Sequence, residues 1–487
     1  MQKITTQGMR LVDEQGRERI FHGINLKGDN RVMEALTWLD EDFFRQSKEL
    51  GFHLLRLGIG WKDYEPQQGQ YNEELLQKID EIFDWAAKYN VYIFFDLHQD
   101  LYSAFGDTVG NGAPDWATVT DGIKRGKTHF VWGEGYFWDK AVHRAFDNFW
   151  RNTLVDGKGL QDHFAALWQM LARRYGDHPA LFGWDLLNEP HPGKAGGKVF
   201  RQLVGKLIRM CLISPKVRRI KFIKSLINKE KHGFMLDVLT PEMMHKITHA
   251  AYKTVYQFEQ EYYAPFIARM SKALREVTPN GIIVMEHNYF SNLGIPFNTK
   301  LPEWETSILY SPHGYDLTVD TPAYKYANNA RVGYIFDQSR ASQLRAGIPT
   351  MVGEWGGGGE GEGFFPHIEF LMNKFDSYNW SNTYFAYKKG FYDQPLIRVV
   401  SRPHPMAVNG EIKSFNVNSE NRVFTLEYTP SEGDLFTEIY LPNGYESVDA
   451  GEGAQIEMDG NVLKVKTKAG KIVVKYINRE YVPAEEE

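Results

Sequence analysis

Ala180-Leu-Phe-Gly-Trp-Asp-Leu-Leu-Asn-Glu-Pro190 is the stretch from which the fold of this chain can be predicted. An apolar run from Leu181 to Leu187, bounded by turn-forming residues, is typical of a strand covered on both faces. The run ends at Asn188 and Glu189, and Pro190 stops it. A parallel α/β barrel places its catalytic groups at the carboxyl ends of its strands. The stretch therefore predicts a barrel strand with an active-site carboxylate; a solvated glutamate at a strand end is the alternative.

A second apolar run that ends in a carboxylate lies far downstream, at Pro349-Thr-Met-Val-Gly-Glu-Trp355. Two glutamates at the ends of separate buried strands, Glu189 and Glu354, suit retaining glycoside hydrolysis. One carboxylate attacks the anomeric carbon, and the other protonates the leaving oxygen and later activates water. The two carboxyl groups must then lie roughly 5–5.5 Å apart. A barrel brings its strand ends together at one face, where this distance can be met.

Strand-like and helix-like segments alternate over residues 1–393. Besides the run at 181–187, apolar runs predict strands at 20–26, 52–58, 91–97, 281–286, 307–312, 349–354 and 382–387. Apolar residues at helical spacing predict helices at 41–50, 72–89, about 139–176, 257–277, 326–346 and 363–378. A hairpin within 8–20, with its turn at 13–16, is expected to plug the barrel floor. Eight strands with helical crossovers predict a (β/α)8 TIM barrel.

The pattern changes from about residue 394. Short alternating runs, separated by turn signals such as Pro442-Asn-Gly444 and Asp459-Gly460, replace the helical spacing. Such runs predict antiparallel strands. Residues 394–487 are therefore predicted to form a small C-terminal β-sandwich.

Composition limits the possible functions of the 487-residue chain. A net charge of -6 argues against a general nucleic-acid binder. Cys211 is the one cysteine, which suits a reducing compartment. The N-terminus has no apolar core of a signal peptide, and there is no apolar run of about 18 residues that could span a membrane. We therefore expect a soluble, cytoplasmic protein, or a secreted one if the sequence has been trimmed.

Polar residues mark other predicted strands of the barrel. Arg56 lies inside the otherwise apolar second strand, and a buried arginine needs a carboxylate partner. Glu354 is the candidate partner, because a nearby arginine keeps a nucleophile ionised; a purely structural ion pair is the alternative. His98 closes the third strand, and His313 and Tyr315 follow the sixth. Beside two glutamates, these residues are expected to bind sugar hydroxyls or to control pKa values.

These residues together resemble glycoside hydrolase family 5 (clan A), and within it the endoglycoceramidase-like branch. Asn188-Glu189-Pro190 and Gly353-Glu354-Trp355 match the acid/base and nucleophile motifs of the family. Its recurring active-site positions are matched by Arg56, His98, Asn188, His313 and Tyr315. The branch is indicated by Asp96-Leu-His-Gln-Asp-Leu-Tyr-Ser103, Gly110-Asn-Gly-Ala-Pro-Asp-Trp116 and Arg402-Pro-His-Pro-Met-Ala-Val408.

The resemblance implies a retaining β-glycosidase that cleaves a glycan from a lipid aglycone such as ceramide, with no cofactor and no metal. It also implies that Lys27 and Asp100 contact the sugar and that Glu286 lies near the aglycone side. Asn188 is expected to bind the sugar 2-OH. Three alternatives stay open: an exo-acting β-glucosidase on glucosylceramide or a steryl glucoside, a plain glucanase, and a glycolipid-binding protein without turnover.

The eighth strand departs from the family pattern. Family members usually have a tryptophan near its end, under the sugar at the cleavage point, but the stretch Asn382-Thr-Tyr-Phe-Ala-Tyr-Lys388 has none. Tyr384 or Tyr387 is expected to replace it as the platform, unless Trp380 reaches in from the preceding turn. The identity of the bound sugar therefore stays open.

A basic insertion at about 198–240 follows the fourth strand. Residues 198–231 contain eleven Lys or Arg and one acidic residue, Glu230, with apolar residues interleaved. A basic amphipathic segment suits an anionic membrane surface, where each Lys or Arg contributes about 1 kcal/mol. Peripheral contact with a membrane is thus one prediction, and an extra helical hairpin with a solvated basic face is the other.

Overall fold

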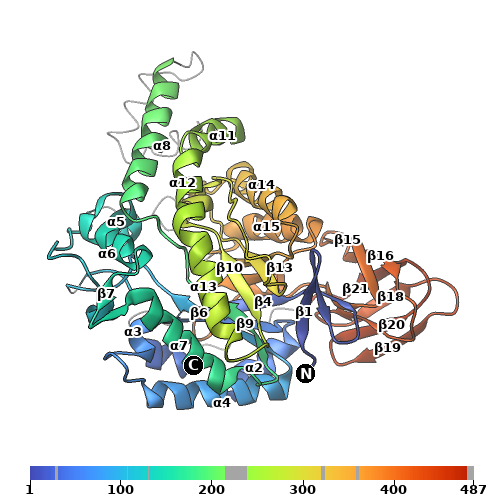
Figure 1. The fold of residues 1–487 in the computed structure, drawn as a ribbon. Helices are drawn as coiled ribbons and strands as arrows, with labels where there is room; N and C mark the ends of the chain where they lie inside the picture. Colours follow the sequence, from blue (N-terminus) through green and yellow to red (C-terminus); the bar gives the residue numbers. More distant parts are fainter. Residues whose placement is uncertain are drawn as a thin grey trace, which may run out of the picture.

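The computed structural model describes residues 1–27, 31–106, 108–129, 131–213, 239–319, 324–357 and 361–479. Eight parallel strands form one sheet in the order β11-β10-β9-β6-β5-β4-β13-β12. The two edge strands, β11 and β12, meet through backbone hydrogen bonds from Gly353 to Pro312 and from Gly314 to Glu354, each 3.1 Å long. These bonds close the sheet, so the predicted (β/α)8 barrel is confirmed (Figure 1).

All eight predicted barrel strands are present. Their bounds are β4 His22–Lys27, β5 Leu54–Gly60, β6 Tyr92–His98, β9 Leu181–Asp185, β10 Ile282–Glu286, β11 Ile308–Ser311, β12 Met351–Gly356 and β13 Ser381–Phe385. Every residue of β5, β6, β9, β10, β11 and β12 is buried. Continuous burial explains why these strands are apolar runs rather than alternating patterns.

The helices surround the barrel. The α-helices are α1 Val32–Leu36, α2 Glu41–Glu49, α3 Trp61–Tyr64, α4 Glu73–Tyr89, α5 Gly135–Trp138, α6 Lys140–Trp150, α7 Leu160–Tyr175, α8 Lys194–Ile213, α11 Pro241–His249, α12 Tyr252–Phe258, α13 Ala264–Arg275, α14 Asn329–Ala346, α15 Phe365–Ser377 and α16 Ile397–Val400. Short 3-10 helices are η1 Asp115–Ala117, η2 Trp132–Glu134, η5 Tyr289–Leu293, η6 Tyr324–Tyr326, η7 Glu362–Phe364 and η8 Phe391–Asp393; η4 Glu259–Tyr263 is a π-helix that joins α12 to α13.

Helix α4 shows how the sequence specifies these elements. Its N-cap Asn72 accepts a hydrogen bond from the backbone N–H of Leu75, which satisfies a donor left free at the helix start. Leu75, Ile79 and Phe83 recur at helical spacing and are fully buried. The helix ends at Asn90, whose left-handed backbone (φ 58°) is a common helix terminator. Capping and periodicity therefore give the same bounds.

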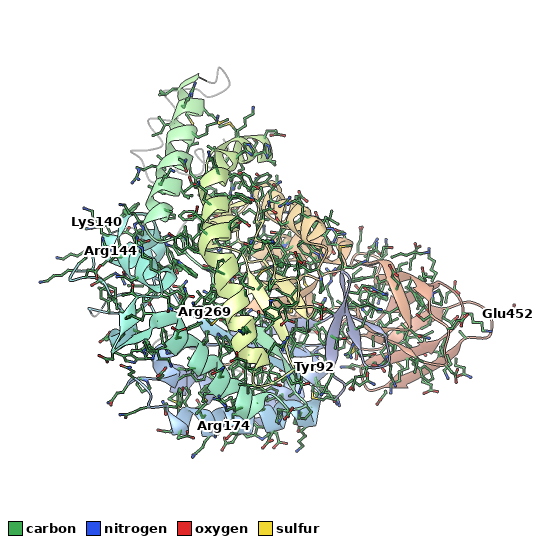
Figure 2. All side chains as sticks on the ribbon, in the orientation of Figure 1. Tyr92, Lys140, Arg144, Arg174, Arg269 and Glu452 are labelled. Atoms are coloured by element: carbon green, nitrogen blue, oxygen red, sulfur yellow. The ribbon has the colours of Figure 1, made fainter. Side chains whose placement is uncertain are left out.

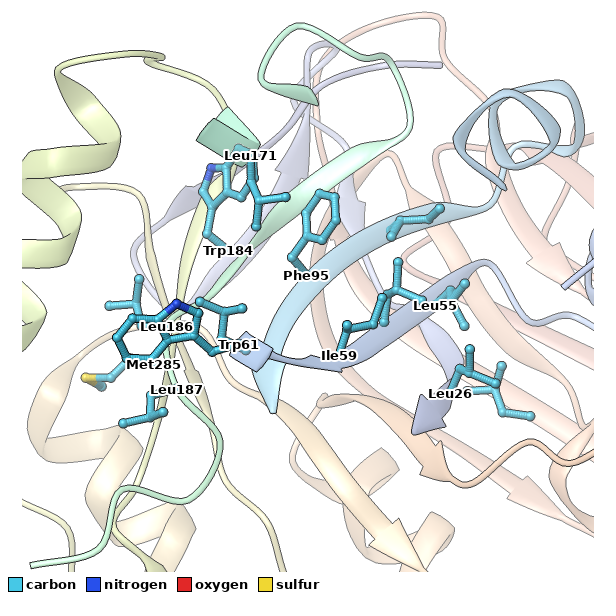
Figure 3. Packing of buried hydrophobic residues seen from close by; sticks show 14 of the residues in the cluster. Leu26, Leu55, Ile59, Trp61, Phe95, Leu171, Trp184, Leu186, Leu187 and Met285 are labelled. Carbon is cyan, nitrogen blue, oxygen red and sulfur yellow. The ribbon is translucent and has the colours of Figure 1, made fainter. Parts of the chain in front are cut away.

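Aromatic packing fills the layer between the strands and the outer helices. Phe95 on β6 stacks almost parallel on Trp184 of β9, with ring centroids 5.7 Å apart, and Leu171 of α7 lies beside them (Figure 3). All three side chains are fully buried. This layer fixes the positions of neighbouring strands, because close-packed cores tolerate little displacement.

The N-terminal strands are β1 Ile4–Gln7, β2 Arg10–Asp13 and β3 Glu18–Arg19. Strands β2 and β3 form the hairpin predicted within 8–20, and β1, which was not predicted, pairs with β2. Ile4 and Leu11 are buried in a cluster with Leu54, Phe94 and Phe182, which belong to the barrel strands. The hydroxyl of Tyr92, at the start of β6, donates a 2.7 Å hydrogen bond to the backbone of residue 2. The hairpin therefore plugs the barrel floor, as the sequence predicts.

The C-terminal part is an antiparallel β-sandwich, as predicted. Its strands are β14 His404–Val408, β15 Gly410–Asn418, β16 Val423–Pro430, β17 Thr437–Tyr440, β18 Tyr445–Asp449, β19 Gln455–Asp459, β20 Val462–Lys466 and β21 Lys471–Tyr476. One sheet has the order β15-β16-β21-β18 and the other β1-β2-β3-β14-β17-β20-β19. Because β3 pairs with β14, the N-terminal hairpin joins the barrel to the sandwich (Figure 1). A short hairpin, β7 Leu154–Val155 and β8 Lys158–Gly159, separates α6 from α7.

No helix within the described part of the chain is both long enough and apolar enough to cross a bilayer.

We expect Leu11→Ala to destabilise the protein, because the leucine side chain is 4% exposed and packs in the barrel floor. A buried Leu→Ala substitution costs about 2–5 kcal/mol of unfolding free energy. Urea denaturation, followed by tryptophan fluorescence, measures the midpoint. Leu154→Ala is the control, because Leu154 is 67% exposed and should change stability by less than about 0.5 kcal/mol. Equal midpoints for the two variants would contradict the packed plug.

Candidate active site

The two predicted glutamates meet at the carboxyl end of the barrel. Glu354 lies in β12, and Glu189 follows β9. A carboxylate oxygen of Glu189, one of Glu354 and a ring nitrogen of His313 all lie within 4.8 Å of one another. The barrel therefore brings together carboxylates that are far apart in the sequence, at a spacing compatible with retaining glycoside hydrolysis.

Arg56 is the charged centre beneath these groups. Its guanidinium binds Glu354 Oε1 (2.5 Å), Glu286 Oε1 (2.6 Å), Asp96 Oδ2 (2.9 Å) and Asp185 Oδ2 (3.0 Å). Burial alone would lower the pKa of Arg56, but the four carboxylates raise it well above its usual value. The predicted pairing of Arg56 with Glu354 is present, within a larger network that links five strands or strand ends.

Glu354 is held as a carboxylate. Burial alone would raise its pKa, but the His313 and Arg56 cations lower the pKa of Glu354 below its ordinary value. The Tyr315 hydroxyl donates to Glu354 Oε2 at 3.0 Å. A Cβ added to Gly353 would lie 2.8 Å from His313 Nε2, so only glycine leaves room for this imidazole. Glu354 is therefore ionised and oriented for attack.

Glu189 has the opposite electrostatic character. Burial raises the pKa of Glu189, and the bond from His313 Nδ1 to Oε1 (3.1 Å) offsets this only in part. Its backbone has φ 42°, a strained region for a non-glycine residue, and its N–H donates to Glu286 Oε2 at 2.6 Å. A carboxyl group with a raised pKa is suited to donate a proton near neutral pH.

Glu286, which is expected near the aglycone side, does not line the cavity. Its side chain is fully buried behind the cavity, where it bonds to Arg56, His313 and the backbone of Glu189. Burial would raise the pKa of Glu286, but the His313 and Arg56 cations lower it to about 2. Glu286 is therefore an anion that binds the Arg56 and His313 cations and anchors the backbone at Glu189.

The two predicted histidines are both cationic. Burial alone would lower the pKa of His313, yet Glu286 and Glu354 raise it well above its usual value. Burial would also lower the pKa of His98, but Asp96 and Asp100 raise it to about 10. His98 Nδ1 lies 2.7 Å from Asp96. These charges explain why the site can hold several carboxylates within a few ångströms of each other.

A cavity of about 1010 Å³ opens above this network. Seven of the predicted site residues line it: His98, Asp100, Asn188, Glu189, Tyr315, Glu354 and Tyr384. Arg56, Glu286 and His313 lie buried behind it. Lys27 ends β4, but its side chain lies outside the described residues.

The end of the eighth strand presents Tyr384 and Phe385 to the cavity. Trp380 does not reach in: it is fully buried and donates to Gln343 at 2.8 Å. Tyr387 instead packs edge-on against Phe43 in the barrel wall. Of the three predicted platforms, only Tyr384 therefore lies at the cavity, with Phe385 as a second ring that was not predicted.

Several residues of the network were not predicted from the sequence. Asp96 and Asp185 are charges inside apolar strand runs, so the rule that a buried charge needs a partner could have found them. Asn25 on β4 accepts from Arg56 and donates to Gly353. Asn292 donates to Glu189 Oε1 at 2.6 Å. Asn25 lies inside the predicted strand 20–26, so the same rule for buried polar groups could have found it, whereas no sequence signal separates Asn292 from loop residues.

The three carboxylates Asp96, Asp185 and Glu286 are close enough to share one metal ion, as are Glu189, His313 and Glu354. Arg56 binds all three members of the first group. In the second group, His313 is cationic, and a protonated imidazole cannot ligate a metal through the nitrogen that carries the proton. In both groups, a protein cation, Arg56 or His313, therefore lies where a metal ion would bind the carboxylates.

An aromatic wall forms one side of the cavity; it consists of Trp132, Phe137 and Tyr289, with Val131 and Leu293 beside them. The ring centroids of Phe137 and Tyr289 lie 6.1 Å apart. The wall is on the Glu189 side, because Leu293 follows Asn292, whose amide binds Glu189. The cavity is therefore amphiphilic: carboxylates lie at its base, and the aromatic residues that line it include this wall on the Glu189 side.

A closed parallel barrel with a carboxylate pair of opposite pKa shifts at its carboxyl end is the arrangement that a retaining glycoside hydrolase requires. The family model described as "Cellulase (glycosyl hydrolase family 5)" matches residues 12–212 and 244–390, and that of the glycoside hydrolase family 5 C-terminal domain matches 402–482. The chain belongs to glycoside hydrolase family 5.

Relatives place its similarity in the endoglycoceramidase-like branch. Endoglycoceramidase I of Rhodococcus hoagii (strain 103S) is 24% identical, over 98% of this chain and 88% of the relative. An endoglycoceramidase of Cyanea nozakii is 32% identical over 39% of this chain, a match that spans 42% of the relative. Endo-glycoceramidase II from Rhodococcus sp., solved as a ganglioside GM3 complex, has a TM-score of 0.69 and 22% identity, covering 97% of this chain and 100% of that chain.

We expect Tyr315→Phe to move the acid limb of the pH–activity profile to higher pH. The hydroxyl bond to Glu354 Oε2 favours the ionised carboxylate, so its loss raises the pKa of Glu354, and the nucleophile becomes protonated at a higher pH. A charge-assisted hydrogen bond corresponds to about one pH unit. The profile of kcat/KM on an aryl β-glycoside measures this shift; an unchanged acid limb would contradict the role of the bond.

Proposed function

We propose that this chain is a retaining β-glycosidase that hydrolyses the bond between a glycan and a lipid aglycone such as ceramide. Glu354 is the nucleophile and Glu189 the acid/base. The observation that carries the proposal is the position of the aromatic wall on the Glu189 side of the cavity. The acid faces the departing group, so an apolar wall on that side suits an apolar leaving group.

The reaction is a double displacement. Glu354 attacks the anomeric carbon while the bond to the aglycone oxygen breaks and the Glu189 proton passes to that oxygen. Glu189, now a carboxylate, then removes a proton from water as the water oxygen attacks the anomeric carbon and Glu354 leaves. The lowered pKa of Glu354 and the raised pKa of Glu189 provide the two protonation states with which the cycle begins.

The relatives support the substrate class. Two are named endoglycoceramidases, and the structure from Rhodococcus sp. contains ganglioside GM3. Their named substrates carry a glycan on an apolar aglycone, which agrees with the amphiphilic cavity. Tyr384 and Phe385 stand where the family pattern has a tryptophan, so the sugar platform of this chain has a smaller ring.

We expect purified protein to release intact oligosaccharide and ceramide from lactosylceramide and a ganglioside in detergent, as measured by mass spectrometry. Glu354→Gln should reduce turnover by about 10³-fold or more, because it removes the nucleophile. A 2-fluoro glycoside should label Glu354 in the wild-type protein. Full turnover by Glu354→Gln would refute the assignment.

Other products would identify the alternatives. Glucose from glucosylceramide alone would indicate an exo-acting β-glucosidase. Cleavage of glucan but of no glycolipid would indicate a glucanase. Binding of glycolipid without any release or labelling would indicate a binding protein.

We also propose that the enzyme contacts an anionic membrane surface through α8, the described part of the basic insertion. This helix extends away from the barrel (Figure 1). Its 20 residues include five basic residues and no acidic one: Lys194, Lys198, Arg201, Lys206 and Arg209. Ile208 and Leu212 are 49% and 55% exposed. Residues 214–238 of the insertion lie outside the described residues.

A chain of aromatic rings connects α8 with the cavity. Phe200 on α8 stacks on Phe137 of the aromatic wall, with centroids 4.7 Å apart, and lies 5.7 Å from Trp138. Trp138 is 46% exposed. Lys140 of the adjacent α6 adds positive charge on this side of the molecule (Figure 2), whereas Arg144 is paired with Asp121 at 2.5 Å. A lipid surface at α8 would therefore adjoin the aglycone side of the cavity.

We expect the protein to sediment with phosphatidylserine-containing vesicles more than with pure phosphatidylcholine vesicles. Lys206→Glu/Arg209→Glu should weaken this binding at least about tenfold, since each basic residue contributes about 1 kcal/mol. Lys413→Glu/Lys468→Glu, on exposed positions of the sandwich, makes the same charge change and should bind like the wild type. Equal binding by both double variants would refute the role of α8.

A further inference from the structure

Asn292 on η5 touches the acid/base directly. Its Nδ2 donates to Glu189 Oε1 at 2.6 Å, and the same oxygen lies 3.1 Å from Nδ1 of the cationic His313. Asn292 also lines the cavity. One oxygen of Glu189 is therefore occupied by two N–H donors from two different loops.

The Asn292 amide is contacted from behind. It lies 2.6 Å from His287 Nε2, and His287 Nδ1 lies 2.9 Å from the Tyr310 hydroxyl. Burial and the nearby His313 cation lower the pKa of His287 to about 3, so the imidazole is neutral and has one N–H. The backbone N–H of His313 donates to Nε2 at 3.2 Å, which seats the ring against the end of β11. The packed imidazole limits the positions that the Asn292 side chain can take.

We infer that Asn292 is a positioning residue that, held by His287, directs Glu189 Oε1 to accept hydrogen bonds and leaves Oε2 to carry the proton given to the leaving group. A carboxyl oxygen that accepts from two donors is a poor site for its own proton, whereas the other oxygen is free to bear it. The proton leaves Oε2 in the first step and returns from water in the second.

Other charged groups around Glu189 also influence its pKa, so the contribution of Asn292 must be separated from theirs. His313 and Glu354 lie within 4.8 Å of it, and Glu286 binds its backbone N–H. These groups fix the total charge, but among the described residues only Asn292 and His313 are bonded to Oε1. A donor to the carboxylate favours its ionised form, so removing Asn292 should raise the pKa of Glu189. The alkaline limb of the profile, which reports loss of the Glu189 proton, should then move to higher pH.

The inference rests on Glu189 as acid/base, but not on a lipid substrate, so aryl β-glycosides test it separately. We expect Asn292→Ala to lower kcat/KM about tenfold on a phenyl glycoside, whose leaving group needs a proton. On a dinitrophenyl glycoside, whose leaving group departs without one, the change should be under about threefold. The alkaline limb of the pH profile should move to higher pH by about one unit, the effect of one charge-assisted hydrogen bond.

Asn292→Asp keeps the shape of the side chain and guards against misfolding. It places a carboxylate against Oε1, so the alkaline limb should move in the same direction and further. Asn298→Ala is the matched control: it changes another asparagine between β10 and β11, whose amide binds Tyr252 outside the cavity, and should alter neither the leaving-group dependence nor the limb.

Equal losses on both glycosides with an unmoved alkaline limb would overturn the inference and leave Asn292 a structural residue. A wild-type enzyme that cleaves aryl glycosides but no glycolipid would refute the lipid substrate alone. Absence of hydrolysis of both aryl glycosides and glycolipids by the wild type would overturn both proposals.

Discussion

One buried guanidinium organises the active site. Arg56 is 1% exposed, and leaving such a charge unpaired would cost several kcal/mol. Its five donors are satisfied only when β4, β6, β9, β10 and β12 present their polar side chains at one level of the barrel. The rigid fork of arginine can bond to several partners at fixed angles, which the flexible ammonium of lysine cannot. Closure of the barrel and assembly of the site therefore depend on the same interaction.

The same charge balance makes two identical side chains chemically different. Glu354 bonds directly to Arg56 and faces His313, so its ionised form is favoured in spite of burial. Glu189 has no bond to Arg56 in this network, and burial raises its pKa. Glu286 pairs with both Arg56 and His313 and so neutralises part of their positive charge. The opposite pKa shifts of Glu354 and Glu189 thus follow from their different distances to the Arg56 cation.

The loops determine what the carboxylates act on. The barrel strands supply the charged base of the cavity, whereas the aromatic wall comes from the segment 131–137 and from η5. Such a division is common in barrels, where the strands hold the chemistry and the loops vary the substrate. In this protein the aromatic rings continue to α8, so the apolar side of the cavity reaches the molecular surface.

The sequence alone determined the barrel, the sandwich and the two candidate catalytic carboxylates, because each rests on a local pattern: apolar runs, helical spacing, turn residues and short motifs at strand ends. It also indicated Arg56, since a charge within an apolar strand must have a partner, and His313, since it follows the end of a strand. Tertiary structure decided the rest. Glu286 lies behind the cavity, Tyr384 and not Trp380 lines it, and Asn25 and Asn292 join the site. The direction of a side chain at a strand end depends on loops distant in sequence, and no local periodicity records their packing.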